Sequence, residues 1–285
     1  MFSKTFTSVG ASLLAMAFTP AALAQVQRGD LGTDSVGASW NYKPGDPSGP
    51  ENWASIAATC ATSASQPQSP LNIIVTNSTT PPIPADLVTV YSSTNATVEN
   101  SHFTRSLTFG NAPTNTLTAG TTSASVTYNL IGIHAHSPSE HSVGTVASDA
   151  ELHLVHKSAS GQIAVVAILL TAVSKGGNAD INKILALNSK SKSLAVNPAN
   201  LLPAGFASNF YTYVGSLTTP PCTTGVAFYV LKTPQQVSKA AIEKLQSTVK
   251  SLSKAAKAPK GGYKFNNRVP LQNSEGRVPF SMPAN

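Results

Sequence analysis

Three histidines have a spacing that could hold a metal ion. His134 and His136 lie two residues apart in a β-like segment, and His153 lies in a second β-like segment further along the chain. Because side chains two apart on a strand point to the same face, His134 and His136 stand side by side. If the two segments pair, His153 can converge on the same point. Three imidazoles without a thiolate suit zinc with an open fourth position, which is typical of a catalytic site.

Two carboxylates accompany these histidines in a chain that is poor in acidic residues. Glu140 follows His136 closely, and Glu151 shares a strand face with His153. A ligand histidine needs its second nitrogen fixed by a hydrogen bond, often to a carboxylate, and Glu151 is placed for such a role. Either glutamate could instead be an ordinary surface acid, and any single histidine could be an ordinary core or surface side chain. His141 and His156 lie off the inferred face and are interpreted as structural.

A rigid loop, GSLTTPPC at 215–222, places two threonine hydroxyl groups directly before two prolines. One interpretation is a surface turn. The other is a fixed hydroxyl that accepts a hydrogen bond from a metal-bound hydroxide and donates its own to a carboxylate. Thr218 and Glu140 could form such a pair.

Strands must position most of these side chains. The run Gln162–Ala172 is almost uninterruptedly apolar, which favours a central strand covered on both faces. We also expect a short helix at 178–188, a loop at 189–210, and a long helix opening at Thr233-Pro234 with Thr as N-cap. No linker divides the chain, so the sequence predicts one mainly β domain with few helices. The other expected strands cover 71–75, 87–91, 103–109, 123–136, 150–156 and 226–231.

The first 24 residues have the features of a secretory signal peptide. Lys4 precedes the apolar run Val9–Phe18, and Ala22-Leu23-Ala24 fits a cleavage site. The run is too short and too polar to span a bilayer comfortably, although an uncleaved anchor is the alternative. We expect residues 1–24 to be the signal peptide and 25–285 to form the domain. The protein is then secreted, or periplasmic in a bacterium, with no membrane span.

Export also bears on the two cysteines and on two possible glycosylation sites. An oxidising compartment favours a Cys60–Cys222 disulfide, the alternative being two free buried thiols. Asn77 and Asn95 each begin an Asn-x-Thr triplet, a short motif that also occurs by chance.

The net charge of +7 does not predict a nucleic-acid partner. Much of the excess lies in Lys239–Lys264, where no aromatic residue interleaves until Tyr263 and Phe265. This stretch is typical of a solvated helix face and its exit.

Taken together, the motifs resemble those of the α-class carbonic anhydrases, from about Trp40 to Arg277. The resemblance implies a single domain with a large, mostly antiparallel twisted sheet of about ten strands, a few short peripheral helices and zinc in a conical cleft. The motifs that carry it are HAH at 134–136 followed by SEH at 139–141, ELHLVH at 151–156, YVGSLTTPPC at 213–222, QSPLNI at 68–73, and Asn267-Arg268 with Gln272.

The resemblance also implies an activity: reversible hydration of carbon dioxide to bicarbonate and a proton, by attack of zinc-bound hydroxide, with weak esterase activity alongside. It implies small-molecule substrates only, and a monomer or homodimer. By family match the zinc ligands are His134, His136 and His153. The other implied roles are hydroxide orientation for Thr218 backed by Glu140, support of His153 for Glu151, proton transfer for His102, bicarbonate seating for Thr219, and a carbon dioxide pocket of Leu217, Val155, Val165 and Val226.

Three positions depart from the family pattern. Gly132 stands where a glutamine often supports the first ligand, Phe228 stands where a tryptophan is usual, and one residue is inserted before Pro270. The alternative function is a catalytically silent binding protein on the same fold. Such relatives usually lose a ligand histidine, whereas this chain keeps all three. A zinc peptide hydrolase is disfavoured because the chain lacks HExxH.

Overall fold

A computed structural model describes residues 40–63, 65–74, 85–100, 104–110, 115–121, 124–252, 271–272 and 280–281. The expected signal peptide at 1–24 lies outside the described residues. So do His102, Asn77 and the Asn267-Arg268 motif.

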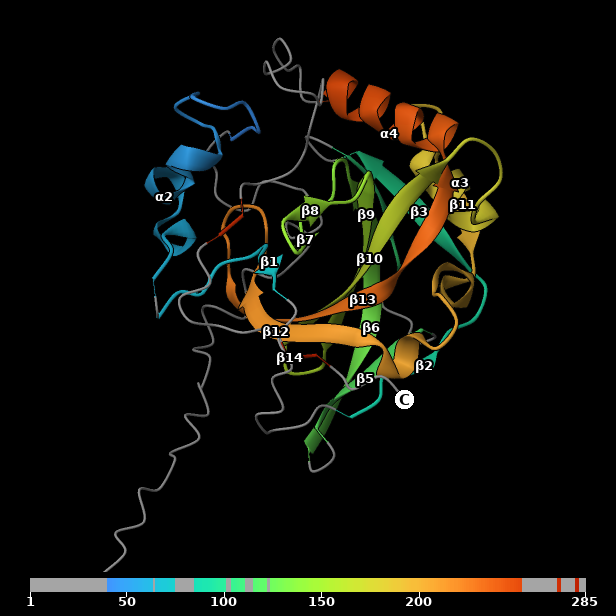
Figure 1. Ribbon diagram of the computed structural model, residues 1–285, viewed down its shortest axis with the longest axis horizontal. Coiled ribbons are helices and arrows are strands. Elements are labelled where there is room, and N and C mark those ends of the chain that lie inside the picture. Colours follow the sequence, from blue (N-terminus) through green and yellow to red (C-terminus); the bar gives the residue numbers. More distant parts are fainter. Residues whose placement is uncertain are drawn as a thin grey trace, which may run out of the picture.

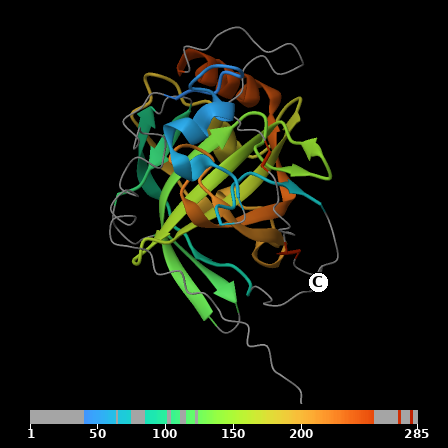
Figure 2. The ribbon, with the colours of Figure 1, turned by 90° about the vertical axis from the view of Figure 1, so that its left-hand side faces the viewer.

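One large twisted sheet forms the body of the molecule (Figures 1 and 2). Eleven of the described strands join it, in the order β11-β3-β4-β6-β9-β10-β13-β12-β14, with β5 on β6 and β2 on β5. Among the described strands of this sheet, all pairings are antiparallel except that of β10 with β13, which confirms the predicted fold class. The strands are β2 (Val88–Val90), β3 (Thr94–Asn100), β4 (Arg105–Thr108), β5 (Thr116–Thr121), β6 (Ala124–His136), β9 (Ala150–Ser158), β10 (Ile163–Val173), β11 (Ser193–Val196), β12 (Phe210–Ser216), β13 (Thr224–Ser238) and β14 (Phe280–Ser281).

Three shorter strands form a separate small sheet: β1 (Asn72–Ile73), β7 (Ser142–Val143) and β8 (Val146–Ala147). The pairing of β1 with β7 is parallel. This small sheet fixes the segment that follows Glu140.

The predicted central strand is β10, and it is covered on both faces. Its alternate residues Ala164, Val166 and Ile168 join one apolar cluster, whereas Val165 and Ala167 join another on the opposite face. A strand buried on both sides needs no polar alternation, which explains its continuous apolar run.

Two helices cover the first of these faces. They are α3 (Ala179–Leu185) and α4 (Lys239–Leu252), which lie side by side in Figure 1. Ile242, Leu245 and Val249 of α4 are buried in the cluster, and their spacing of three and four residues puts them on one helical face. The opposite face of the sheet is therefore left to carry the polar site.

The expected start of the long helix at Thr233-Pro234 is wrong. Strand β13 continues to Ser238, and α4 begins at Lys239 with the Ser238 hydroxyl accepting from the backbone N–H of Ala241 at 3.2 Å. The register between β10 and β13 shifts at this point. Because proline has no N–H for a ladder, a local irregularity can hold it within a strand.

The expected loop at 189–210 is also wrong in part. It contains β11 and two short 3-10 turns, at Pro198–Leu201 and Phe206–Ser208. Strands β3, β5 and β12 were not predicted either. Strand β5 reads TLTAGT. Only Leu117 and Ala119 alternate with polar residues there, and so short an alternation is a weak signal of a strand.

A third cluster joins the N-terminal part to the end of the predicted hydroxyl loop. Trp40, Tyr42 and Trp53 pack together with Cys222. Trp53 opens the short helix α2 (Trp53–Ile56), which lies between 3-10 turns at Pro50–Asn52 and Ala58–Cys60. Cys60 is disulfide-bonded to Cys222, as predicted.

Among the described residues, no helix has the length and apolar character required to cross a membrane.

Candidate metal centre

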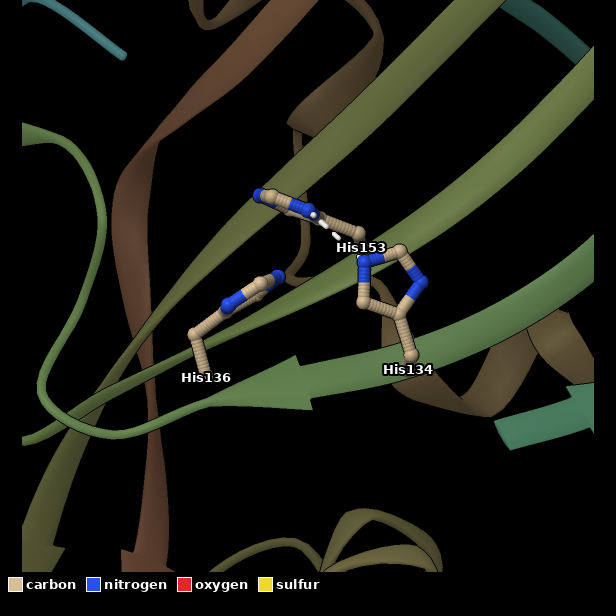
Figure 3. Close-up of side chains that lie close together, drawn as sticks. All are labelled: His134, His136 and His153. Atoms are coloured by element: carbon tan, nitrogen blue, oxygen red, sulfur yellow. Dashed lines mark hydrogen bonds between the residues drawn. The ribbon is translucent and has the colours of Figure 1, made fainter. Parts of the chain in front are cut away.

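The pairing of β6 with β9 brings the three predicted ligands together. His134 lies directly opposite His153, and His136 lies opposite Glu151. Figure 3 shows the three imidazole rings around a common gap. One nitrogen from each ring lies within 4.8 Å of the others. His136 and His153 are 0% and 2% exposed, so the group stands in the protein rather than on its surface.

The spacing of these nitrogens fits a zinc ion. His153 Nδ1 lies 3.3 Å from His134 Nε2. A tetrahedral zinc with bonds of about 2.0–2.1 Å separates its ligand nitrogens by roughly 3.3 Å. Three neutral imidazoles are also the donor set of known catalytic zinc sites. The residues present therefore suit this metal.

Glu151 fixes the orientation of His153. Its Oε1 accepts from His153 Nε2 at 2.7 Å. A proton held on Nε2 leaves the Nδ1 lone pair directed at the common gap, which is the tautomer that a metal ligand needs. The carboxylate is 0% exposed, so solvent does not weaken this contact. The sequence-based pairing of Glu151 with His153 has this geometric basis.

A second histidine holds the same carboxylate from behind. His141 Nδ1 lies 2.6 Å from Glu151 Oε1, and the His141 backbone N–H donates to Oε2 at 2.8 Å. The interpretation of His141 as structural agrees with these contacts. The trio His141, Glu151 and His153 could also be considered a metal group, but its facing atoms already contact one another at hydrogen-bond distance.

The hydrogen-bonded network continues to the loop that contains Thr218. Tyr213 Oη lies 2.7 Å from His141 Nε2 and 3.0 Å from Ser69 Oγ. Ser69 and Ser216 exchange two hydrogen bonds, each using a backbone N–H and a side-chain oxygen, at 3.0 and 3.1 Å. Ser216 precedes Leu217 and Thr218. The network therefore links a predicted ligand to the base of the predicted catalytic loop.

Sequence reasoning did not find Tyr213 and Ser69 as parts of this network. Both fall inside the family motifs, but their residue types alone signal no chemistry. Their packing explains the glycine at 215, because a Cβ at this position would lie 2.0 Å from Ser69 Oγ and 2.8 Å from a ring carbon of Tyr213.

Electrostatics differ between the Glu151 carboxylate and the candidate ligand His134. Burial opposes ionisation of Glu151, but the charges and hydrogen bonds of His141 and His153 outweigh it and hold the pKa of Glu151 well below its ordinary value. Burial, followed by the neighbouring His136 and His153, lowers the pKa of His134 well below its ordinary value. These shifts favour an ionised Glu151 and a neutral His134, and a histidine must be neutral to bind a cation.

His134 has less support than His153. Its Nδ1 is buried and has no hydrogen-bond partner in the described structure. Gly132, two residues earlier on the same strand face, has no side chain to offer one.

Both members of the predicted Thr218–Glu140 pair are buried. Glu140 is 0% exposed, and its Oε2 lies 3.4 Å from His136 Nε2. Thr218 is buried in the turn after β12, where Leu217 N–H donates to Thr223 O and Cys222 N–H donates to Thr219 O. The disulfide ties this turn to Cys60.

Tyr42 was not predicted to lie near the site, yet the Glu140 charge acts on it. Burial and then this charge raise the pKa of Tyr42 well above its ordinary value.

The predicted apolar pocket residues gather in one buried cluster. Val155 pairs with Val165 across β9 and β10, and both join Leu217 and Val226 in the apolar cluster on the site face. Phe228 belongs to the same cluster and stacks on Tyr213. Thr219 is half-buried.

Asn95, a predicted glycosylation site, is exposed on β3.

His156 is on the other face of β9, where its Nε2 lies 2.6 Å from Tyr91 Oη. Its neighbours Leu152 and Leu154 belong to the helix-covered cluster, which agrees with its interpretation as a structural residue.

Comparison with known proteins places the chain among carbonic anhydrases. The family model described as eukaryotic-type carbonic anhydrase matches residues 48–281. Alpha carbonic anhydrase 3 of Arabidopsis thaliana is 31% identical, over 87% of this chain and 86% of that protein. A carbonic anhydrase of Klebsiella pneumoniae is 30% identical, over 95% and 98%. The match to alpha carbonic anhydrase 4 of Arabidopsis thaliana, 37% identical, spans 53% of this chain and 52% of that relative.

Solved structures agree with these relatives. The α-carbonic anhydrase of Photobacterium profundum has a TM-score of 0.65 and 31% identity, over 85% of this chain and 99% of that one. Dioscorin complexed with ascorbate has a TM-score of 0.69 and 27% identity, over 86% and 98%.

Proposed function

Because the chain belongs to the eukaryotic-type carbonic anhydrase family, we propose that it catalyses the zinc-dependent, reversible hydration of carbon dioxide to bicarbonate and a proton. The observation that carries the proposal is the convergence of His134, His136 and His153, with the tautomer of His153 set by Glu151. A closed structural site would use four protein ligands, whereas three imidazoles leave a position open.

Zinc, when bound, supplies the Lewis-acid chemistry that lowers the pKa of water to about 7, a value established for carbonic anhydrases. His134, His136 and His153 would hold it. Side chains of this protein orient the attacking oxygen. The buried Glu140 carboxylate accepts a hydrogen bond from the Thr218 hydroxyl, so that the Thr218 oxygen is left to accept a hydrogen bond and orient the attacking oxygen. Such an arrangement would need little reorganisation during the reaction because both residues are buried.

The apolar cluster provides the surface that binds carbon dioxide. Carbon dioxide has no net dipole, so a wall formed by Val155, Val165, Leu217 and Val226 can hold it near the polar group without hydrogen bonds. The product is an anion, and we propose that Thr219 at the edge of the turn helps to seat it. The change from an apolar substrate to a charged product favours release toward water.

Proton export needs a group that titrates near neutral pH, and a histidine suits this role. His102 remains our proposal for the shuttle. The same oxygen nucleophile can attack an activated ester, so we also propose a weak esterase activity.

We further propose that the chain is exported, with residues 1–24 as signal peptide and Asn77 and Asn95 as glycan acceptors. The Cys60–Cys222 disulfide supports an oxidising compartment, and Asn95 is accessible on β3.

A catalytically silent binding protein is the second candidate. Two similarities support this candidate. The fold is similar to that of dioscorin, solved with ascorbate, and the chain is 30% identical to dioscorin DB3L of Dioscorea polystachya over 86% of each chain. The three retained histidines and the support of His153 by Glu151 favour the enzyme.

The test is carbon dioxide hydration by stopped flow on the zinc-loaded protein, beside His153→Ala and the control His156→Gln. We expect fast hydration in the parent and the control, and loss of both zinc and hydration in His153→Ala. A folded parent that binds zinc but does not exceed the buffer rate would support the silent binding protein. A parent that takes up no zinc would overturn the zinc site itself.

A further inference from the structure

The three candidate ligands are not equally supported. His153 has the Glu151 carboxylate on the nitrogen that faces away from the common gap. His134 has a buried Nδ1 with no hydrogen-bond partner in the described structure. The two rings face each other across paired strands, so the contrast arises within one site.

Metal binding makes this difference matter. His134 Nε2 faces His153 Nδ1 at 3.3 Å. Because Glu151 leaves His153 Nδ1 unprotonated, Nε2 of a metal-free His134 can carry the proton and donate it across this gap. A metal on His134 Nε2 requires the proton on Nδ1 instead. That N–H then points into a buried position without an acceptor, which is unfavourable.

The absence of an acceptor follows from one residue. Gly132 precedes His134 by two positions on β6, so a side chain there would stand on the same strand face as the imidazole. Its strand neighbours are Val155 on β9 and Thr108 on β4. Gly132 is not among the glycines with positive φ, so its backbone does not require glycine.

We propose that Gly132 weakens the metal affinity of this centre by withholding a hydrogen-bond acceptor from His134. His134 is then the ligand released first, and the centre exchanges zinc faster than one in which every ligand has an outer partner. Partners of this kind typically change metal affinity 10- to 100-fold. The inference rests on the proposed zinc-dependent function and concerns the same site.

The test compares Gly132→Gln with Gly132→Leu. Glutamine brings an amide oxygen that can accept from His134 Nδ1, whereas leucine has similar bulk and no acceptor. The readouts are the zinc dissociation constant, from competition with a chelator, and the rate of zinc loss to excess chelator. We expect Gly132→Gln to bind zinc about 10-fold more tightly than the parent and to lose it more slowly, with no such gain in Gly132→Leu.

Equal affinities in the two variants, or a glutamine variant no tighter than the parent, would overturn the proposal. A parent that binds no zinc would instead overturn the proposed function. Nitrogen-15 NMR of the zinc-loaded parent gives a test without substitutions. We expect a His134 Nδ1–H signal upfield of the Glu151-bound Nε2–H signal of His153, and two equally downfield signals would contradict the inference even if neither variant folds.

Discussion

Glu151 Oε1 lies 2.7 Å from Nε2 of His153 and 2.6 Å from Nδ1 of His141. One buried carboxylate oxygen therefore orients the ring of a candidate metal ligand and is itself held by a second ring. The negative charge is needed in this place, since a neutral amide offers one acceptor and a donor group that would face a histidine N–H.

Replacing Glu151 with glutamine should weaken zinc binding about 10- to 100-fold, the range found for outer partners of metal ligands. The His153 tautomer is then no longer enforced by charge. Chelator competition measures the loss. Glu243→Gln, on the exposed face of α4, is the matched control and should leave the zinc affinity unchanged. Equal affinities in both variants would show that Glu151 does not orient the ligand.

The second prediction concerns pH and the His156–Tyr91 contact. Burial lowers the pKa of His156 from 6.5 to about 4. Between these two pH values the unfolded chain therefore binds more protons than the folded protein. The stability of the folded protein falls as the pH drops from about 6.5 toward 4. At pH 4 and below, the loss approaches about 3 kcal/mol.

Denaturant unfolding of the parent and of His156→Gln between pH 4 and 7.5 measures this contribution. The parent should lose more stability on acidification than the variant, which has no imidazole to protonate. Parallel pH curves for the two proteins would exclude His156 as the source.

A third prediction concerns Gly215. A methyl group there would overlap the Ser69 hydroxyl, at 2.0 Å in the present arrangement, and force apart the Ser69–Ser216 contacts. Gly215→Ala should cost about 1–3 kcal/mol of unfolding free energy, as overpacking usually does. Gly110→Ala is the control because nothing lies within 4 Å of its added carbon. A Gly215→Ala protein as stable as this control would contradict the close packing.

The disulfide gives a fourth prediction. Cys60 and Cys222 are 162 positions apart, so the bond closes a long loop in the unfolded chain. The double variant Cys60→Ser, Cys222→Ser should lose about 2–5 kcal/mol of unfolding free energy. Urea titration measures it, and the reduced parent should match the variant. A reduced parent as stable as the oxidised one would show that the bond contributes little.

The fifth prediction separates the Thr218 hydroxyl from its methyl group. Thr218→Ala should lower carbon dioxide hydration about 100-fold, as the loss of one oriented hydrogen bond does at other active sites, with zinc content unchanged. Thr218→Ser keeps the hydroxyl and should retain most of the rate. Similar rates in the alanine and serine variants would remove Thr218 from its proposed role.

Much of the centre could be predicted from spacing alone. The two-residue period of a strand placed His134 beside His136, and the pairing of β6 with β9 brought His153 opposite His134. The continuous apolar run of β10 likewise identified a strand buried on both faces. In each case the signal is local and repeats with the period of the element.

Other features needed the tertiary structure. Thr233-Pro234 has the local signature of a helix start, yet pairing with β10 holds this segment in a strand. Ser69 and Tyr213 are 144 positions apart, and no local pattern joins two hydroxyl groups over such a distance. The missing partner of His134 Nδ1 depends on what surrounds the ring, which residue spacing does not report.

The aromatic cluster beside the disulfide decides what intrinsic fluorescence can report. The chain has two tryptophans, and their rings lie 5.1 Å apart in contact with Tyr42. The tryptophan emission therefore follows only the corner where the N-terminal segment meets Cys222. Unfolding of the large sheet leaves no separate tryptophan signal. Circular dichroism in the far ultraviolet is needed beside fluorescence, and a difference between the two curves would reveal this corner detaching before the sheet unfolds.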